Sequence, residues 1–383
     1  MSSTSRSGPD RCPGALRVHA AADGGLARVR LPGGALTRPQ LDALADASRE
    51  LGDGFLELTS RANLQIRGLA GGAEHELSER LQGAGLLPSA AHERVRNILG
   101  SVLTGRDGNG LLDVRPVVAA LDAGLCADPS LARLPGRFLF AVDDGRGDVI
   151  ALRADVGLHA VAPDAFALVL AGKDSGLRAL PGDAAALALD AARAFLRVRT
   201  SEWRLAELGR DLPLPGARSE PVPIPAVPRR TPLGEIPQRD GRTAFSGLVP
   251  LGRLDPAGLS AAGEIIVTPW RGLVIPGIGD MPHFPGLVTG PDWAGLTSCA
   301  GRPGCAKSLT DVRADAALAR RAGGGLPVHW SGCDRQCGRP ADRHVAVVAT
   351  AGGYEVRLGG EVRARSHDLT ATVAAAATTR RSE

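Results

Sequence analysis

Apolar and polar positions alternate over two separated parts of the chain, and the first part has a strand–helix–strand order. Residues 26–31 alternate as a β-strand does, and a Pro-Gly-Gly turn follows them. Thr37 is a suitable N-cap for a helix whose leucines and alanines recur on one face, and Gly52 predicts its end. Residues 55–59 and 63–67 then have the pattern of two further strands.

A similar order recurs in residues 245–278. A short helical stretch is predicted over residues 255–262, with strands before and after it. Aligning residues 56–66 with residues 265–275 places Thr59 opposite Thr268. The recurrence predicts an internally duplicated half-domain, and the alternative is chance similarity between strings rich in Leu, Val and Gly.

The rest of the chain mixes helix and strand patterns. We predict a helix over residues 74–81, a strand over 137–142 and a long Ala/Leu helix over 183–203. Eight prolines between residues 211 and 237 exclude a helix there and predict a semi-rigid, extended linker.

Composition narrows the class of protein. A net charge of +4 on 383 residues is too small to indicate a nucleic-acid binder. Apolar runs are all shorter than the about 18 residues that span a bilayer, and the polar N-terminus has no signal-peptide pattern. We therefore expect a cytoplasmic protein with no membrane partner. Of the 45 basic residues, only Lys173 and Lys307 are lysines.

Four of the six cysteines form two close pairs, whereas Cys12 and Cys126 stand alone. The paired cysteines are Cys299 with Cys305 and Cys333 with Cys337. Zinc sites usually have two to four residues between paired cysteines, and here the first spacing is five. Four thiolates in this arrangement favour an iron–sulfur cluster over zinc or inert thiols.

At these motifs the chain resembles the superfamily of sulfite and nitrite reductases, which includes the precorrin-3B synthases. The cysteine pattern is similar to its [4Fe–4S] signature, residues 59–67 to its tetrapyrrole-contacting strand, and residues 96–98 to a further contact segment. The resemblance implies an α+β fold: duplicated ferredoxin-like half-domains, a central α/β domain and a C-terminal iron–sulfur α/β domain. The expected divisions are two half-domains at 12–72 and 241–283, a central domain at 73–210, a linker at 211–240 and a cluster domain at 284–383.

The resemblance also implies site residues. The cluster ligands would be Cys299, Cys305, Cys333 and Cys337. A macrocycle with many carboxylates needs cationic, bidentate partners, which arginine supplies. The expected tetrapyrrole-binding residues are Arg61, Asn63, Gln65, Arg67, Arg96, Asn97 and Arg137. For each arginine the alternative is a solvated surface residue.

Within the superfamily, three segments resemble the precorrin-3B synthase branch: residues 12–14, 268–273 and 299–301. Residues 337–340 are closer to the reductases. The synthase branch implies O₂-dependent hydroxylation of precorrin-3A with γ-lactone formation in aerobic cobalamin biosynthesis, and a mononuclear non-haem iron. The eight histidines show no compact ligand motif, so catalytic residues stay unassigned. The alternatives are a short siroheme-dependent sulfite or nitrite reductase and a non-catalytic tetrapyrrole carrier.

Two further expectations follow. The sequence has no nicotinamide or flavin fingerprint, so electrons would come from a separate reductase or an NAD(P)H-linked partner. The reductases hold their small anion with a Lys-x-Lys pair. At the corresponding place this chain has residues 200–203, which contain the acidic Glu202 and no lysine. Poor reduction of sulfite and nitrite is therefore expected.

Overall fold

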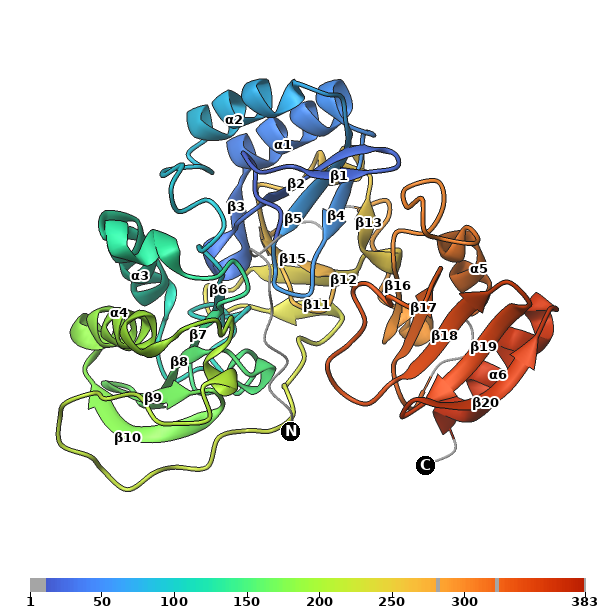
Figure 1. The fold of residues 1–383 in the computed structure, drawn as a ribbon. Coiled ribbons are helices and arrows are strands. Elements are labelled where there is room, and N and C mark those ends of the chain that lie inside the picture. Colours follow the sequence, from blue (N-terminus) through green and yellow to red (C-terminus); the bar gives the residue numbers. More distant parts are fainter. Residues whose placement is uncertain (1–11, 280–282, 321–323, 382–383) are drawn as a thin grey trace.

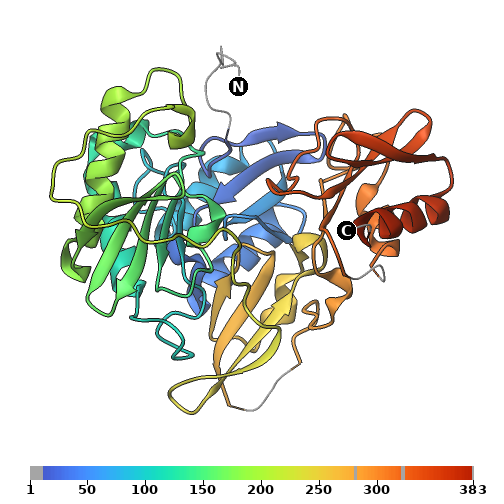
Figure 2. The ribbon, with the colours of Figure 1, turned by 90° about the horizontal axis from the view of Figure 1, so that it is seen from below.

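The computed structural model describes residues 12–279, 283–320 and 324–381, and it contains four five-stranded sheets in three lobes. Two sheets form the central lobe, and each outer lobe is built on one sheet (Figure 1). Seen from below, the central lobe lies between the outer lobes (Figure 2). The chain is thus a mixed α/β protein with several sheets. No helix among the described residues has the length and apolarity needed to cross a membrane.

The first central sheet contains the strands predicted near the N-terminus. Its order is β1 (His19–Ala21), β2 (Gly24–Val29), β5 (Leu64–Leu69), β4 (Leu56–Leu58) and β13 (Arg253–Leu254). Helix α1 (Arg38–Leu51) begins after Thr37 in a capping box with Gln40, as predicted, and buries Leu41 and Leu44 against this sheet. Helix α2 (Ala73–Gly83) packs on α1 and adds Leu77 and Leu81 to the same core, which therefore continues beyond residue 72.

The second central sheet exchanges a strand with the first. Its order is β11 (Gly234–Pro237), β12 (Thr243–Leu248), β15 (Gly272–Ile278), β14 (Glu264–Val267) and β3 (Ala35–Thr37). Strand β3 comes from the N-terminal half and pairs with β14, whereas β13 comes from the second half and pairs with β4. The two sheets consequently share one hydrophobic core.

The turns that connect β4 to β5 and β14 to β15 have matching geometry. The Thr59 hydroxyl accepts a hydrogen bond of 3.1 Å from the Asn63 amide, and the Thr268 hydroxyl accepts one of 3.1 Å from the Gly272 amide. Each turn also holds one residue other than glycine in the left-handed region, Ala62 at φ 53° and Arg271 at φ 57°. The two aligned segments therefore form the same local structure.

The remaining sheets share one topology, in which three parallel strands are followed by two antiparallel ones. The outer lobe formed by the middle of the chain, called the central α/β lobe for its place in the sequence, contains β6 (Ile98–Gly100), β7 (Phe140–Asp143), β8 (Val156–Ala162), β9 (Ala165–Leu170), β10 (Lys173–Ala179), α3 (Arg115–Ala127) and α4 (Pro181–Val198). The C-terminal lobe contains β16 (Leu296–Ser298), β17 (Val328–Ser331), β18 (Val345–Thr350), β19 (Gly353–Leu358), β20 (Glu361–Ser366), α5 (Val312–Leu318) and α6 (Leu369–Arg381). The internal likeness thus extends beyond the half-domains that the sequence indicated.

Several predicted elements differ in extent. The stretch predicted as helical over 255–262 is only a short 3-10 helix, Pro256–Leu259, between two strands. The strand predicted from 137 begins at Phe140, and the long helix ends at Val198. Residues 211–233 contain no helix or strand, as the prolines predict, but β11 occupies the end of the predicted linker because it pairs with β12.

Candidate iron–sulfur and tetrapyrrole site

The four paired cysteines lie on two loops that leave adjacent parallel strands. Cys299 directly follows β16, and Cys333 comes two residues after the end of β17. Because β16 and β17 are parallel neighbours, their carboxyl ends lie at the same edge of the sheet. Cys305 and Cys337 lie further along the same two loops. The fold therefore brings the two pairs to one edge of the C-terminal sheet.

Backbone hydrogen bonds hold these loops together around Cys299. Its amide donates to the Trp330 carbonyl at 2.9 Å, and its sulfur accepts from the Gly332 amide at 3.3 Å. Burial raises the pKa of the Cys299 thiol, the amides of Gly332 and Gly301 oppose this, and the thiols of Cys337 and Cys305 add smaller effects that raise it. The thiols of Cys305 and Cys337 thus both lie near that of Cys299.

The surroundings of the cysteines contain polar atoms that lack partners. Ser298 and Ser331 are the last residues of β16 and β17, and their hydroxyls are buried and form no hydrogen bond. His329 Nε2 is also buried without a hydrogen-bond partner. In the central α/β lobe the serine that follows the equivalent strand, β6, does have a hydrogen-bond partner: the Ser101 hydroxyl donates to Asp148 at 2.6 Å. Unsatisfied buried polar groups are costly, so this edge of the C-terminal sheet is suited to a bound group.

The donor chemistry fits a [4Fe–4S] cluster, since four thiols and an amide directed at sulfur are available. No three His, Cys, Asp or Glu side chains of the described residues form a metal-binding group in the structure. The same finding means that the described residues offer no ready set of ligands for a mononuclear iron.

Arg67 connects the predicted tetrapyrrole-contacting strand to the first cysteine loop. Its guanidinium donates twice to Asp23, at 2.9 Å each, and once to the Gly304 carbonyl at 2.8 Å. A Cβ atom at Gly304 would lie 2.8 Å from Asp23 and 3.0 Å from Arg67, so a larger residue there would displace this pair. Arg67 therefore holds the loop, and its donors are not directed at a ligand.

Arg61 has the properties expected of a ligand-binding arginine. Its guanidinium makes no hydrogen bond or ion pair with any described residue, although it is half-buried. Burial lowers the pKa of Arg61 to about 10, and the charge of Arg204 lowers it further; Cys12 raises it, and Arg28 and Asp155 have smaller, opposite effects. Three guanidinium groups thus approach one another here, with Asp155 as the partner of Arg204 at 2.8 Å.

Three of the predicted residues have partners within the protein. Asn63 accepts from the Leu31 amide at 2.9 Å and donates to Asn97 at 3.3 Å, and Asn97 donates to the Gly136 carbonyl at 2.8 Å. Gln65 accepts from Arg28 and donates to Glu57 at 3.3 Å. Asn63 and Asn97 are buried and join the β4–β5 turn to the central α/β lobe.

The two other predicted arginines differ from each other. Arg96 is buried in a bidentate pair with Asp122, 2.7 Å at each oxygen, so its charge is already compensated. Arg137 is exposed and lies over the Trp203 ring, 5.3 Å from its centroid. Arg137 and Arg61 therefore remain available to a ligand, whereas Arg96 and Arg67 are committed to carboxylates.

Two residues of interest were not predicted individually. Arg271 lies in the β14–β15 turn, one position beyond the residue aligned with Arg61, and the internal alignment could have indicated it. His329 is fully buried in β17, and nothing in the sequence around it distinguishes it from a core histidine.

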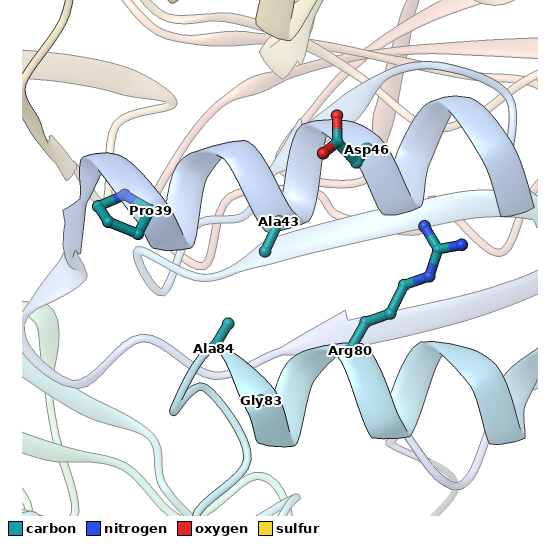
Figure 3. Close-up of a pocket in the computed structure, with 6 residues that line it drawn as sticks. All are labelled: Pro39, Ala43, Asp46, Arg80, Gly83 and Ala84. Carbon is teal, nitrogen blue, oxygen red and sulfur yellow. The ribbon is translucent and has the colours of Figure 1, made fainter.

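A separate groove lies between α1 and α2 on the outer side of the central lobe (Figure 3). Its lining residues are Pro39, Ala43, Asp46, Arg80, Gly83 and Ala84. None of the predicted site residues is among them, so this groove is distinct from the cysteine edge.

Comparison with known proteins agrees with this geometry. The model of the nitrite/sulfite reductase ferredoxin-like half domain matches residues 19–84. A ferredoxin–nitrite reductase of Synechococcus elongatus is 27% identical over 89% of this chain and 81% of its own length. The chain is thus similar to proteins of the nitrite/sulfite reductase superfamily, and residues 19–84 match a domain of that superfamily. The superfamily resemblance that the motifs indicated is thereby confirmed.

The comparisons do not separate the branches of this superfamily. A precorrin-3B synthase of Sinorhizobium sp. is 28% identical over 91% of this chain and 82% of its own length, which is as similar as the reductase. The structure of the Mycobacterium tuberculosis NirA protein aligns with a TM-score of 0.67 at 22% identity, covering 88% of this chain and 75% of that one. The fold is therefore shared with a NirA-type protein.

Proposed function

We propose that this chain is an iron–sulfur oxidoreductase that binds a tetrapyrrole with many carboxylates, and that it is a precorrin-3B synthase. The observation that carries this proposal is the uncompensated guanidinium of Arg61, with Arg204 and Arg28 nearby. A half-buried cation without a carboxylate partner is less favourable than one with an anion bound beside it. A macrocycle rimmed with acetate and propionate groups supplies such anions.

The duplicated ferredoxin-like half-domains belong to the same proposal. The matched turns at Thr59 and Thr268, and the reciprocal exchange of β3 and β13, support two related halves around one core. Each half would present one turn to the tetrapyrrole.

Cys299, Cys305, Cys333 and Cys337 would hold a [4Fe–4S] cluster, which supplies single electrons when bound. Arg67 would keep the first cysteine loop against β5, next to the turn that carries Arg61. Electrons would come from a separate donor protein, and O₂ would be the source of the hydroxyl group added to precorrin-3A. We assign no ligands to a mononuclear iron.

The segment after α4 favours the synthase over a sulfite or nitrite reductase. Glu202 accepts hydrogen bonds from the amides of Thr200 and Ser201, at 2.7 and 3.0 Å, and these lower its pKa and keep it charged. Arg204 in the same segment is neutralised by Asp155. A small anion would meet a carboxylate here and no lysine, and its developing charge would be poorly stabilised.

The second candidate is a short siroheme-dependent reductase, which the similarity to nitrite reductases and residues 337–340 favour. The absorption spectrum of the purified protein separates the two. We expect broad iron–sulfur absorption alone, whereas an intense siroheme Soret band in the protein as isolated would favour the reductase.

A further inference from the structure

Arg271 is an arginine whose charge has no carboxylate partner, and it lies beside the second cysteine loop. Its guanidinium has one hydrogen-bond partner among the described residues, the Gly338 carbonyl, and the distance of 3.4 Å makes this bond weak. The side chain is half-buried, and burial lowers its pKa.

Among the described arginines around Glu57, Arg271 is the one without a carboxylate partner. Four arginines gather here, and the carboxylates available to them are Glu57, Asp23 and Asp53. Arg67 pairs with Asp23 at 2.9 Å, Arg253 with Asp53 at 3.2 Å, and Arg313 bonds Glu57 directly. Glu57 attracts Arg271 only from a distance, so one positive charge at this place lacks a partner.

His329 contributes a second unsatisfied group at the same place. A methyl group added at Gly338 would lie 3.6 Å from Arg271 Nη2 and 4.0 Å from His329 Cε1, so both side chains border this glycine. His329 Nδ1 lies 2.8 Å from the Thr297 hydroxyl, which is only 3.4 Å from the Val328 carbonyl. The shorter contact favours a hydroxyl that donates to Nδ1, and the proton of a neutral ring is then on Nε2, which is near the Cys337 carbonyl but forms no full hydrogen bond.

We propose that Arg271 and His329 form a carboxylate-binding subsite beside Cys337 and Gly338, which receives one acidic side chain of the tetrapyrrole. This inference rests on the proposed function. In this proposal Arg271 binds a tetrapyrrole carboxylate on the side of the C-terminal lobe, as Arg61 would on the side of the central α/β lobe.

A macrocycle explains both arginines better than a small anion does. The groups around Arg61 include Arg204 and Asp155 of the central α/β lobe, whereas Arg271 contacts Gly338 of the C-terminal lobe. A ligand that uses both cations must extend from one lobe to the other, and its carboxylates must be spread around a rim. A single sulfite, nitrite or phosphate ion could occupy only one of the two places.

The test is a fluorescence titration of uroporphyrin III, a metal-free macrocycle with acidic side chains on every pyrrole, by the cluster-containing protein. We expect Arg271→Gln to weaken binding by about tenfold or more, as for loss of a charged hydrogen bond, with Arg271→Lys between it and the parent. Arg253→Gln is the matched control, since it removes the same charge from a neighbouring arginine that already has Asp53 as its partner. Arg253→Gln should leave binding within about twofold of the parent.

A thermal melt of the ligand-free variants separates a ligand-binding role from a structural one. Removing the uncompensated charge of Arg271 should leave Tm unchanged or raise it, whereas Arg253→Gln should lower it. Millimolar sulfite, nitrite or phosphate should not displace the porphyrin. If the parent binds uroporphyrin and Arg271→Gln binds it equally well, or if a small anion displaces it, the subsite is wrong. If the parent binds neither uroporphyrin nor siroheme, the proposed function itself fails.

Discussion

Arg67 Nη2 donates a hydrogen bond of 2.8 Å to the backbone carbonyl of Gly304, which joins strand β5 to the loop between Cys299 and Cys305. The same guanidinium is held by Asp23 through two bonds of 2.9 Å. The strand next to the Arg61 turn and the first cysteine loop are therefore fixed to each other. The relative position of a cluster and a tetrapyrrole would depend on this one buried arginine.

Replacing Arg67 should affect both stability and the cluster. Arg67→Gln leaves Asp23 without its partner and frees the Gly304 carbonyl, so we expect a loss of about 3 kcal/mol in the free energy of unfolding. Iron content after purification should fall as well. Urea unfolding and iron analysis check this, with Arg363→Gln, an exposed partner of Glu361, as a control expected to change stability by less than about 0.5 kcal/mol. A fully stable Arg67→Gln with its full iron content would contradict the role assigned to Arg67.

Each of Cys299, Cys305, Cys333 and Cys337 should be required for the cluster. A serine in place of any one offers a hard oxygen ligand where iron prefers a soft thiolate, so iron and acid-labile sulfide should be lost together. Cys12→Ser and Cys126→Ser are the matched controls and should retain both. Full cluster retention in two of the four variants would show that these cysteines are not the ligands.

The two matched turns should contribute equally to stability. Thr59→Val and Thr268→Val each remove a hydroxyl that accepts backbone amides, at 3.1 Å from Asn63 and Gly272. Each change should cost about 1–2 kcal/mol of unfolding free energy, measured by urea denaturation. The exposed Thr370→Val should change it by less than about 0.5 kcal/mol. Losses that differ strongly between the two turns would argue against equivalent halves.

Much of the central lobe could be predicted because its signals are local. Short stretches of sequence are enough to show the spacing of apolar residues in α1, its Thr37 cap and the glycine at its end. The exchange of β3 and β13 could not be predicted, since these strands have three and two residues and pair with partners roughly two hundred positions away. Strands of two or three residues are too short to show the alternation of apolar and polar residues that predicts a strand.

The candidate site also combines features that local sequence indicates with features that depend on residues distant in sequence. The cysteine spacing is a local pattern, and the fold brings the two cysteine pairs to one edge of the C-terminal sheet. The roles of Arg67 and Arg96 depend on Asp23 and Asp122, which are distant in sequence and distinguishable from other aspartates only by position in space. For the same reason the sequence did not single out Arg271, since a cation without a partner becomes visible only when its surroundings are known.

The buried carboxylates at the end of β7 should make stability depend on pH. Burial and the nearby charge of Asp143 raise the pKa of Asp148 from its ordinary value of 3.8 to about 7. Because the folded state holds this proton more tightly, the stabilisation is complete below about 3.8 and is lost as pH rises through about 7. Relative to Asp148→Asn, the parent should lose about 3 kcal/mol of unfolding free energy between about pH 5 and about pH 8. Parallel pH profiles of the two proteins, measured by urea unfolding, would contradict this.

The central claim is that the tetrapyrrole is the substrate of this protein and that sulfite and nitrite are not. Its most direct test is turnover of precorrin-3A by cluster-containing protein with an electron donor and isotopically labelled O₂, followed by mass spectrometry of the tetrapyrrole. The account predicts a product that has gained labelled oxygen, together with negligible consumption of sulfite or nitrite when reduced methyl viologen and siroheme are supplied instead. An unchanged tetrapyrrole combined with rapid reduction of either anion would contradict the account and establish the reductase.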